Sequence, residues 1–185
     1  MVSNATPDNA GEIRTLAHLL LQSGAVQFGS FTLASGKHSD FYIDVKRAWT
    51  NPQYLAAIAE SFAGRVGTVD RLAGMELGAV PLVVATALRT GHSYVIIRKA
   101  AKDHGTRQRY EGEIPAGGKV LLIEDVSTTG GSAEASIEIL RSAGAVVDRA
   151  LVVLDREEGA TERLRALGVR LEPLITLTQL RGASA

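Results

Sequence analysis

The stretch Val120-Leu-Leu-Ile-Glu-Asp-Val-Ser-Thr-Thr-Gly-Gly-Ser132 decides the fold. It opens with four apolar residues, Val120 to Ile123, and such an unbroken run predicts a strand buried on both faces of a parallel sheet. Glu124 and Asp125 end the run, hydroxyl residues and two glycines follow, and Ala133 to Leu140 is rich in good helix formers. The stretch therefore predicts a strand, a tight loop and a helix.

A loop of this composition suits a phosphate group. In an open α/β sheet the junction lies at the carboxyl ends of the strands, where ligands bind. The helix start offers unpaired N–H groups, the glycines let the backbone approach closely, and the hydroxyls add donors. The loop lacks the lysine of the nucleotide-binding pattern G-x-x-x-x-G-K-[ST], which favours a single phosphomonoester such as a sugar 5-phosphate.

The two acids beside the loop have a separate role in this interpretation. Adjacent strand residues point to opposite faces, so Glu124 and Asp125 are a poor match for carboxylates that share one proton. We expect them to accept hydrogen bonds from sugar hydroxyls, directly or through a hydrated metal ion. The alternative is that Ser132 only caps a helix and that both acids are solvated.

These residues resemble the phosphoribosyl-pyrophosphate (PRPP) motif of type I phosphoribosyltransferases. The alternation of strands and helices along the chain independently predicts a mainly parallel sheet flanked by helices. The resemblance implies the same α/β fold with a small N-terminal hood. It implies PRPP binding by Glu124, Asp125, Val126, Ser127, Thr128, Thr129, Gly130, Gly131 and Ser132.

An aromatic-rich segment from Val26 to Asp44 contains two short β-like runs. Its aromatic residues can be ordinary core, or together with Lys46 and Arg47 they can hold a flat ring and pair with an anion. The string F-G-S-F-T-L-A-S-G-K-H-S-D-F-Y-I-D is similar to the hood of orotate phosphoribosyltransferases, which covers the pyrimidine. This similarity implies that Phe41 and Tyr42 bind orotate.

Positive charge is concentrated between Arg98 and Arg109, although the chain balances 20 basic against 20 acidic residues. We expect a mobile loop from about Lys99 to Pro115 that closes over a polyanion, stabilises a departing pyrophosphate and lets His104 donate a proton. A merely solvated loop and a loop that grips RNA phosphates are the alternatives.

The order R-K-x-x-K-x-H-G in this loop resembles the catalytic loop of the orotate enzymes. The resemblance implies that Arg98, Lys99, Lys102 and His104 bind the pyrophosphate of PRPP, with Arg98, Lys102 and His104 catalytic. In that family some of these residues act on the neighbouring subunit's site. A homodimer with shared active sites is therefore implied.

An arginine follows the next apolar strand, Val146 to Leu154. Arg156 falls at the carboxyl end of that strand, on the ligand side, and a planar guanidinium suits a carboxylate. Simple surface pairing with Glu157 or Glu158 is the alternative. The orotate family implies contacts to orotate from Arg156 and Thr128.

A second strand, turn and helix precede the cationic loop. Arg71 to Met75 reads as a strand, and Pro81 starts a helix, so the turn between them can face the same crevice or be a plain connection. The family uses this turn to hold pyrophosphate. Where relatives carry lysines, this chain has Gln27 in the hood and Leu77 in the turn, and both differences remove positive charge.

Length and composition predict one domain over residues 1–185. Within it, the resemblance implies a hood at about 12–47 and an α/β core at about 52–176. Residues 181–185 read as a frayed tail. The balanced charge predicts no nucleic-acid or membrane partner, and the absence of cysteine fits a cytoplasmic protein. The N-terminus does not read as a signal peptide, and no apolar run reaches the ~18 residues that a membrane span needs.

The resemblance therefore implies transfer of the 5-phosphoribosyl group from PRPP to orotate, giving orotidine 5′-phosphate and pyrophosphate in de novo pyrimidine (UMP) synthesis. It implies Mg²⁺ as cofactor, bound mainly through PRPP and not by protein ligands. The alternatives are a salvage phosphoribosyltransferase for another base, and a PRPP-sensing regulator that binds nucleic acid.

Overall fold

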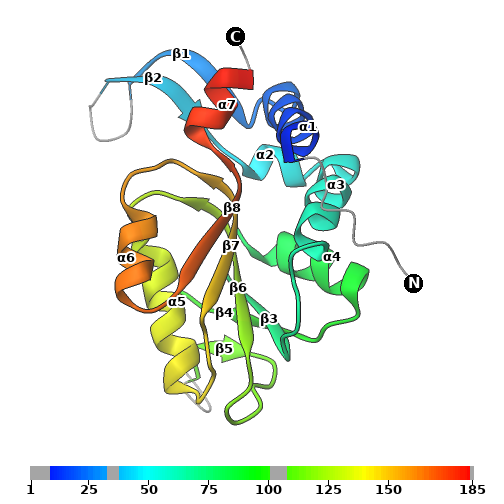
Figure 1. Ribbon diagram of the computed structural model, residues 1–185, viewed down its shortest axis with the longest axis vertical. Coiled ribbons are helices and arrows are strands. Elements are labelled where there is room, and N and C mark those ends of the chain that lie inside the picture. Colours follow the sequence, from blue (N-terminus) through cyan, green and yellow to red (C-terminus); the bar gives the residue numbers. More distant parts are fainter. Residues whose placement is uncertain (1–8, 33–37, 101–107, 184–185) are drawn as a thin grey trace.

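The computed structural model describes residues 9–32, 38–100 and 108–183. A six-stranded sheet of order β5-β4-β3-β6-β7-β8 forms the centre, and a separate hairpin, β1-β2, lies at one end beside α7 (Figure 1). The strands are β1 (Val26–Thr32), β2 (His38–Ile43), β3 (Arg71–Met75), β4 (Tyr94–Ile97), β5 (Tyr110–Glu111), β6 (Val120–Ser127), β7 (Arg149–Asp155) and β8 (Arg170–Thr176). The helices are α1 (Asn9–Gln22), α2 (Lys46–Trp49), α3 (Pro52–Ala63), α4 (Val80–Thr90), α5 (Gly131–Ser142), α6 (Ala160–Ala166) and α7 (Leu177–Ala183).

Strand β6 is buried on both faces, as its apolar run predicts. It pairs in parallel with β3 on one side and with β7 on the other. Leu121 and Ile123 join the hydrophobic core under α3 and α4, whereas Val120 and Leu122 join a second core under α5 and α6. The sheet thus separates two helical layers, which confirms the predicted fold class (Figure 1).

Among the strands that the structure describes, only the one at the β5 edge is antiparallel to its neighbour. β3, β4, β6, β7 and β8 are mutually parallel, and β5 runs antiparallel to β4 through the pairs Ile96 with Glu111 and Ile97 with Tyr110. The predicted loop from Lys99 to Pro115 therefore contains a short strand near its far end. That strand was missed because two residues carry no periodicity.

The predicted hood is an antiparallel hairpin in which Phe28 pairs with Phe41 and Gln27 with Tyr42. At the same end of the molecule α7 packs beside α1 and the hairpin (Figure 1). The prediction of a frayed tail from residue 181 is wrong as far as residue 183. Leu177 and Leu180 are buried, and this tertiary burial stabilises a helix too short to be stable alone.

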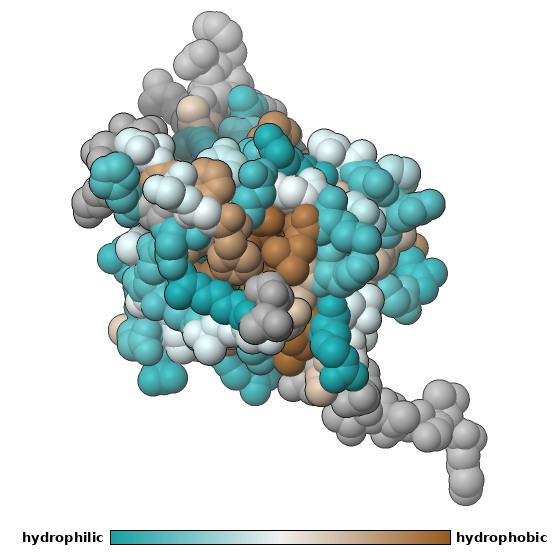
Figure 2. All heavy atoms as spheres, turned by 90° about the horizontal axis from the view of Figure 1, so that it is seen from above, coloured by the Kyte–Doolittle hydropathy of each residue, from teal (hydrophilic) through white to brown (hydrophobic). Residues whose placement is uncertain are grey.

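Figure 2 looks onto the end that carries the hairpin, α7 and α1. Apolar side chains are visible in the middle of this face, and hydrophilic side chains surround them. Within the described residues, no helix combines the length and the apolar character needed to cross a membrane.

Candidate active site

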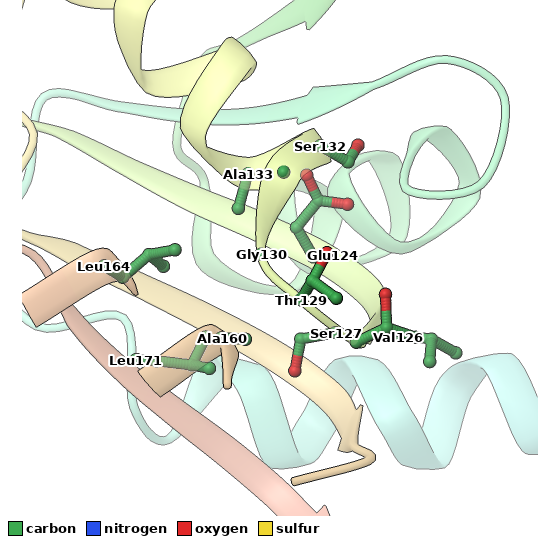
Figure 3. Close-up of a pocket in the computed structure, with 12 residues that line it drawn as sticks. Glu124, Val126, Ser127, Thr129, Gly130, Ser132, Ala133, Ala160, Leu164 and Leu171 are labelled. Carbon is green, nitrogen blue, oxygen red and sulfur yellow. The ribbon is translucent and has the colours of Figure 1, made fainter. Parts of the chain in front are cut away.

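The loop between β6 and α5 forms a cavity of about 110 Å³ at the carboxyl end of the sheet (Figure 3). Gly130, the residue before α5, has φ = 81°, and a Cβ there would lie 3.1 Å from Ala160 Cα and Leu164 Cδ1. Only glycine accommodates both the positive φ and these close neighbours without strain. The lining residues are Glu124, Val126, Ser127, Thr128, Thr129, Gly130, Gly131, Ser132, Ala133, Ala160, Leu164 and Leu171.

The acids do not end the strand, contrary to the prediction. β6 continues to Ser127 because Val126 and Ser127 still pair with Leu154 and Asp155 of β7. Glu124 is consequently only 6% exposed, so it is not a solvated loop acid. Ser132 is not the helix cap either, since Gly130 holds that position and the Ser132 hydroxyl lies 3.6 Å from Met75 Sδ.

Glu124 lies on the cavity side of β6, and its carboxyl group extends toward the start of α5, where Ser132 lies (Figure 3). Burial, and to a smaller extent the negative charge of Asp125, raise the pKa of Glu124 to about 8 against the opposing effects of Lys99 and a hydrogen bond from Ser136. Its Oε1 atom is buried and has no hydrogen-bond partner among the described residues. This oxygen is available to a ligand.

Asp125 connects the loop to the second strand-turn-helix unit. Its Oδ1 accepts a hydrogen bond from the backbone N–H of Val126 at 2.8 Å. A Cβ on Gly78, in the turn after β3, would lie 2.9 Å from Asp125 Cγ and closer still to Oδ2. The turn after β3 therefore packs against the end of β6, next to the phosphate loop.

The hood also reaches this crevice through Lys46. Its Nζ lies 3.0 Å from Asp44 Oδ1. The hydrogen bond to Asp44 raises the pKa of Lys46 most, and the charges of Asp44, Asp125 and Tyr42 raise it further. A cation at the base of the hood therefore lies within the electrostatic field of the phosphate loop.

Arg156 is tied to both the loop and the hood. Its backbone N–H donates to Ser127 O at 3.0 Å, and the neighbouring Ala160 N–H donates to Thr128 O at 3.2 Å. Its guanidinium carbon lies 5.1 Å from the centre of the Phe41 ring. The predicted surface pair also exists, because Arg156 Nη2 lies 2.7 Å from Glu158 Oε1.

The two hood residues predicted to bind orotate, Phe41 and Tyr42, lie in different surroundings. Phe41 and Tyr42 are neighbours on β2, so their side chains point to opposite faces of the strand. Phe41 meets Arg156, whereas the Tyr42 ring packs 5.8 Å from the Phe31 ring and is 39% exposed. Phe41 is therefore the residue that the structure brings to the arginine.

Both ends of the cationic loop are fixed by hydrogen bonds. Arg98 N–H donates to Arg109 O at 2.8 Å, and Arg109 Nη2 donates to Lys99 O at 2.7 Å. Lys99 N–H donates to Glu76 Oε1 at 2.8 Å, and Arg98 forms an ion pair with Glu111 at 3.4 Å. The predicted residues Lys102 and His104 lie outside the described residues.

Two residues of the site were missed by sequence reasoning. Arg181, assigned to the tail, lies 5.4 Å from the centre of the Phe41 ring, and Glu76 anchors the backbone of Lys99. The basic last turn of α7 was a possible signal for Arg181. Glu76 had only its place directly after a strand as a signal, because its partner is distant in sequence.

Comparisons with known proteins agree with this geometry. The model of the phosphoribosyl transferase domain family matches residues 45–169. The chain is 44% identical over 167 residues to the orotate phosphoribosyltransferase of Methanocaldococcus jannaschii, covering 90% of this chain and 95% of that one. The crystal structure of orotate phosphoribosyltransferase from Aeropyrum pernix superimposes with a TM-score of 0.80 at 37% identity, over 90% of this chain and 96% of that one.

A third comparison involves a ligand complex. The crystal structure of Mycobacterium tuberculosis H37Rv orotate phosphoribosyltransferase in complex with PRPP gives a TM-score of 0.76 at 28% identity, over 92% of this chain and 99% of that one. The match of the family model covers most of the chain, and the M. jannaschii relative is matched over nearly its full length. The chain belongs to the phosphoribosyltransferase family and, within it, to the orotate phosphoribosyltransferases.

Proposed function

We propose that this chain transfers the 5-phosphoribosyl group from PRPP to orotate, producing orotidine 5′-phosphate and pyrophosphate for pyrimidine synthesis. One observation carries the choice of base: the Arg156 guanidinium lies beside the hood residue Phe41, while the backbone N–H of Arg156 is bonded to Ser127 at the start of the phosphate loop. A flat pyrimidine with a carboxylate can use the ring and the guanidinium together. Purines and uracil have no carboxylate, so the salvage alternative is not favoured.

In this proposal the loop before α5 binds the 5-phosphate of PRPP. The cavity residues that supply its N–H groups and hydroxyls are Val126, Ser127, Thr128, Thr129, Gly130, Gly131 and Ser132. Glu124 and Asp125 accept hydrogen bonds from the ribose hydroxyls, which suits the Glu124 Oε1 atom, since nothing within residues 9–32, 38–100 and 108–183 donates a hydrogen bond to it. Arg156, Thr128 and Phe41 contact orotate, whereas Tyr42 points to the other face of β2 and supports the hood by packing on Phe31.

The cationic loop acts on the leaving group. Arg98, Lys99, Lys102 and His104 are assigned to the pyrophosphate, where positive charge stabilises the oxygens that become negative as the glycosidic bond to pyrophosphate breaks. Arg98, Lys102 and His104 are the proposed catalytic residues, with His104 as proton donor. The hydrogen bonds at Glu76 and Arg109 fix the ends of this loop while its centre acts on the substrate.

The proposed cofactor is Mg²⁺, carried mainly by PRPP. Within the part of the chain that the structure describes, no group of three or more histidine, cysteine or acidic side chains could hold a metal ion, which suits an ion that PRPP itself carries. When bound, the ion neutralises charge on the pyrophosphate. Glu124 and Asp125 hold the sugar end of PRPP in place during this step.

The proposal extends to a cytoplasmic homodimer with shared active sites and to a single domain in which the hood at about 12–47 covers the core at about 52–176. Mixing a Lys102→Ala protein with an Arg156→Ala protein tests the shared sites. Hybrid dimers should recover activity if Lys102 acts on the partner's site, whereas independent sites should give no recovery.

The reaction is tested by the loss of orotate absorbance with PRPP and Mg²⁺, run beside hypoxanthine, xanthine and uracil. Consumption of orotate alone supports the proposal. If PRPP binds but no base is consumed, the proposal fails and a PRPP-sensing regulator takes its place. Salt-dependent binding of RNA or DNA at physiological ionic strength would then support the regulator.

A further inference from the structure

Helix α7 contacts both the hood residue Phe41 and the segment that carries Arg156. The guanidinium of Arg181, in α7, lies 5.4 Å from the centre of the Phe41 ring, and that of Arg156 lies 5.1 Å from the same ring. Both distances lie within the range of cation–π attraction. A single hood ring is thus held by two arginines from distant parts of the chain.

Each arginine also has a carboxylate partner, which reduces the repulsion between the two cations. Arg181 Nη2 contacts both carboxylate oxygens of Asp40, at 3.0 and 2.8 Å. Arg156 pairs with Glu158 at 2.7 Å. Asp40 precedes Phe41 on β2, so Arg181 grips two consecutive residues of the hood strand.

The other end of α7 is attached to the segment that carries Arg156. The N–H of Thr178 donates to Glu157 Oε2 at 2.8 Å, and hydrogen bonds from the side chain of Thr178, and then from its backbone, lower the pKa of Glu157. Leu177 and Leu180, each next to one of these attachments, are buried. α7 therefore links the turn after β7 to the hood strand β2, and it fixes where Phe41 lies relative to Arg156.

We propose that Arg181 is a positioning residue for the pyrimidine: through Phe41 and Asp40 it holds the hood strand against Arg156, in the arrangement that orotate requires. The inference rests on the proposed function, since it assigns Arg181 to the orotate side of that site. Arg181 acts through Phe41 and leaves the PRPP loop untouched. Its loss should affect recognition of orotate while chemistry and PRPP binding are retained.

The test is steady-state kinetics of Arg181→Ala with orotate and PRPP varied separately. Loss of an exposed ion pair and one cation–π contact should raise the KM for orotate by about 5- to 10-fold. The kcat and the KM for PRPP should stay within about twofold of the wild-type values, since chemistry occurs at other residues. Arg181→Lys should recover part of the loss, because lysine can pair with Asp40 but lacks the planar guanidinium.

A matched control is Arg89→Ala, which removes another exposed helical arginine paired with a glutamate, Glu60. It should leave all three kinetic parameters unchanged. In a Phe41→Leu background, Arg181→Ala should add less than twofold, because the contact through which it acts is already gone.

An unchanged KM for orotate in Arg181→Ala, or a parallel change in all parameters, would overturn the inference while leaving the reaction intact. The inference would also be overturned if Arg181→Ala raised the KM for orotate by the same factor in the Phe41→Leu background as in the wild-type protein. If Arg181→Ala does not fold, Arg181→Lys and Asp40→Asn carry the same comparison. A wild-type protein that consumes no orotate refutes the proposed function itself, so the two failures are distinguishable.

Discussion

The unfolding free energy of the wild-type protein should fall as the pH rises, because Glu124 loses its proton. Glu124→Gln should not show this fall. Burial raises the pKa of Glu124 from 4.5 to about 8. Because the folded-state pKa is the higher one, the folded protein keeps this proton where the unfolded chain releases it. The resulting stabilisation is complete below pH 4.5 and is lost as the pH rises through about 8.

The size of the effect follows from the shift. A rise from 4.5 to about 8, at about 1.4 kcal/mol per pKa unit, corresponds to about 5 kcal/mol in total. Between pH 5 and pH 9 the wild-type protein should lose about 4 kcal/mol of unfolding free energy through this group. Glutamine has a similar shape and does not titrate, so Glu124→Gln should not show this loss.

The assay is urea unfolding of both proteins from pH 5 to pH 9 at constant ionic strength. The informative quantity is the wild-type unfolding free energy minus that of the variant, since other titrating groups cancel. Glu138→Gln, an exposed change on α5, serves as the control and should give a difference that does not vary with pH. A constant difference for Glu124→Gln as well would refute the reasoning, because Glu124 would then titrate as a solvated carboxylate.

Three further substitutions test the site. Lys102→Ala should lower turnover far more than it weakens orotate binding, and unchanged turnover would remove Lys102 from the catalytic role. Arg156→Ala should raise the KM for orotate by about 10-fold or more, because a charged hydrogen bond is lost, and should change the KM for PRPP little. A variant with full orotate affinity would contradict that assignment. Gly78→Ala places a Cβ 2.9 Å from Asp125 Cγ. It should therefore lower the free energy of unfolding, measured by thermal unfolding, by about 1–3 kcal/mol or weaken PRPP binding. A variant equal to wild type in both measurements would disprove the close packing.

Much of the core could be predicted because its signals are local. The apolar run Val120 to Ile123 needs no partner to be read as a buried strand, and the glycines and hydroxyls after it mark the loop. Pro52 and Pro81 likewise fall in the first turns of α3 and α4. These features depend on residues within a few positions of each other.

The remaining features depend on tertiary contacts. β6 runs beyond its apolar residues because β7 supplies hydrogen-bond partners as far as Ser127. α7 is helical because Leu177 and Leu180 find a buried surface, and no composition rule reveals that surface. The contact between Arg156 and Phe41 joins segments that are far apart in sequence, so the resemblance to a family suggested it where spacing alone could not.

The margins of the central sheet have a consequence for self-association. A sheet edge offers unpaired backbone groups on which a strand of another copy can be added, and such growth leads to aggregates. Here one margin is β5, which is only two residues long. The other is β8, in which Arg170 and Glu172 carry charge and Pro173 has no backbone N–H to donate. Both margins are thus poor templates for strand addition, which favours a protein that stays dispersed at high concentration.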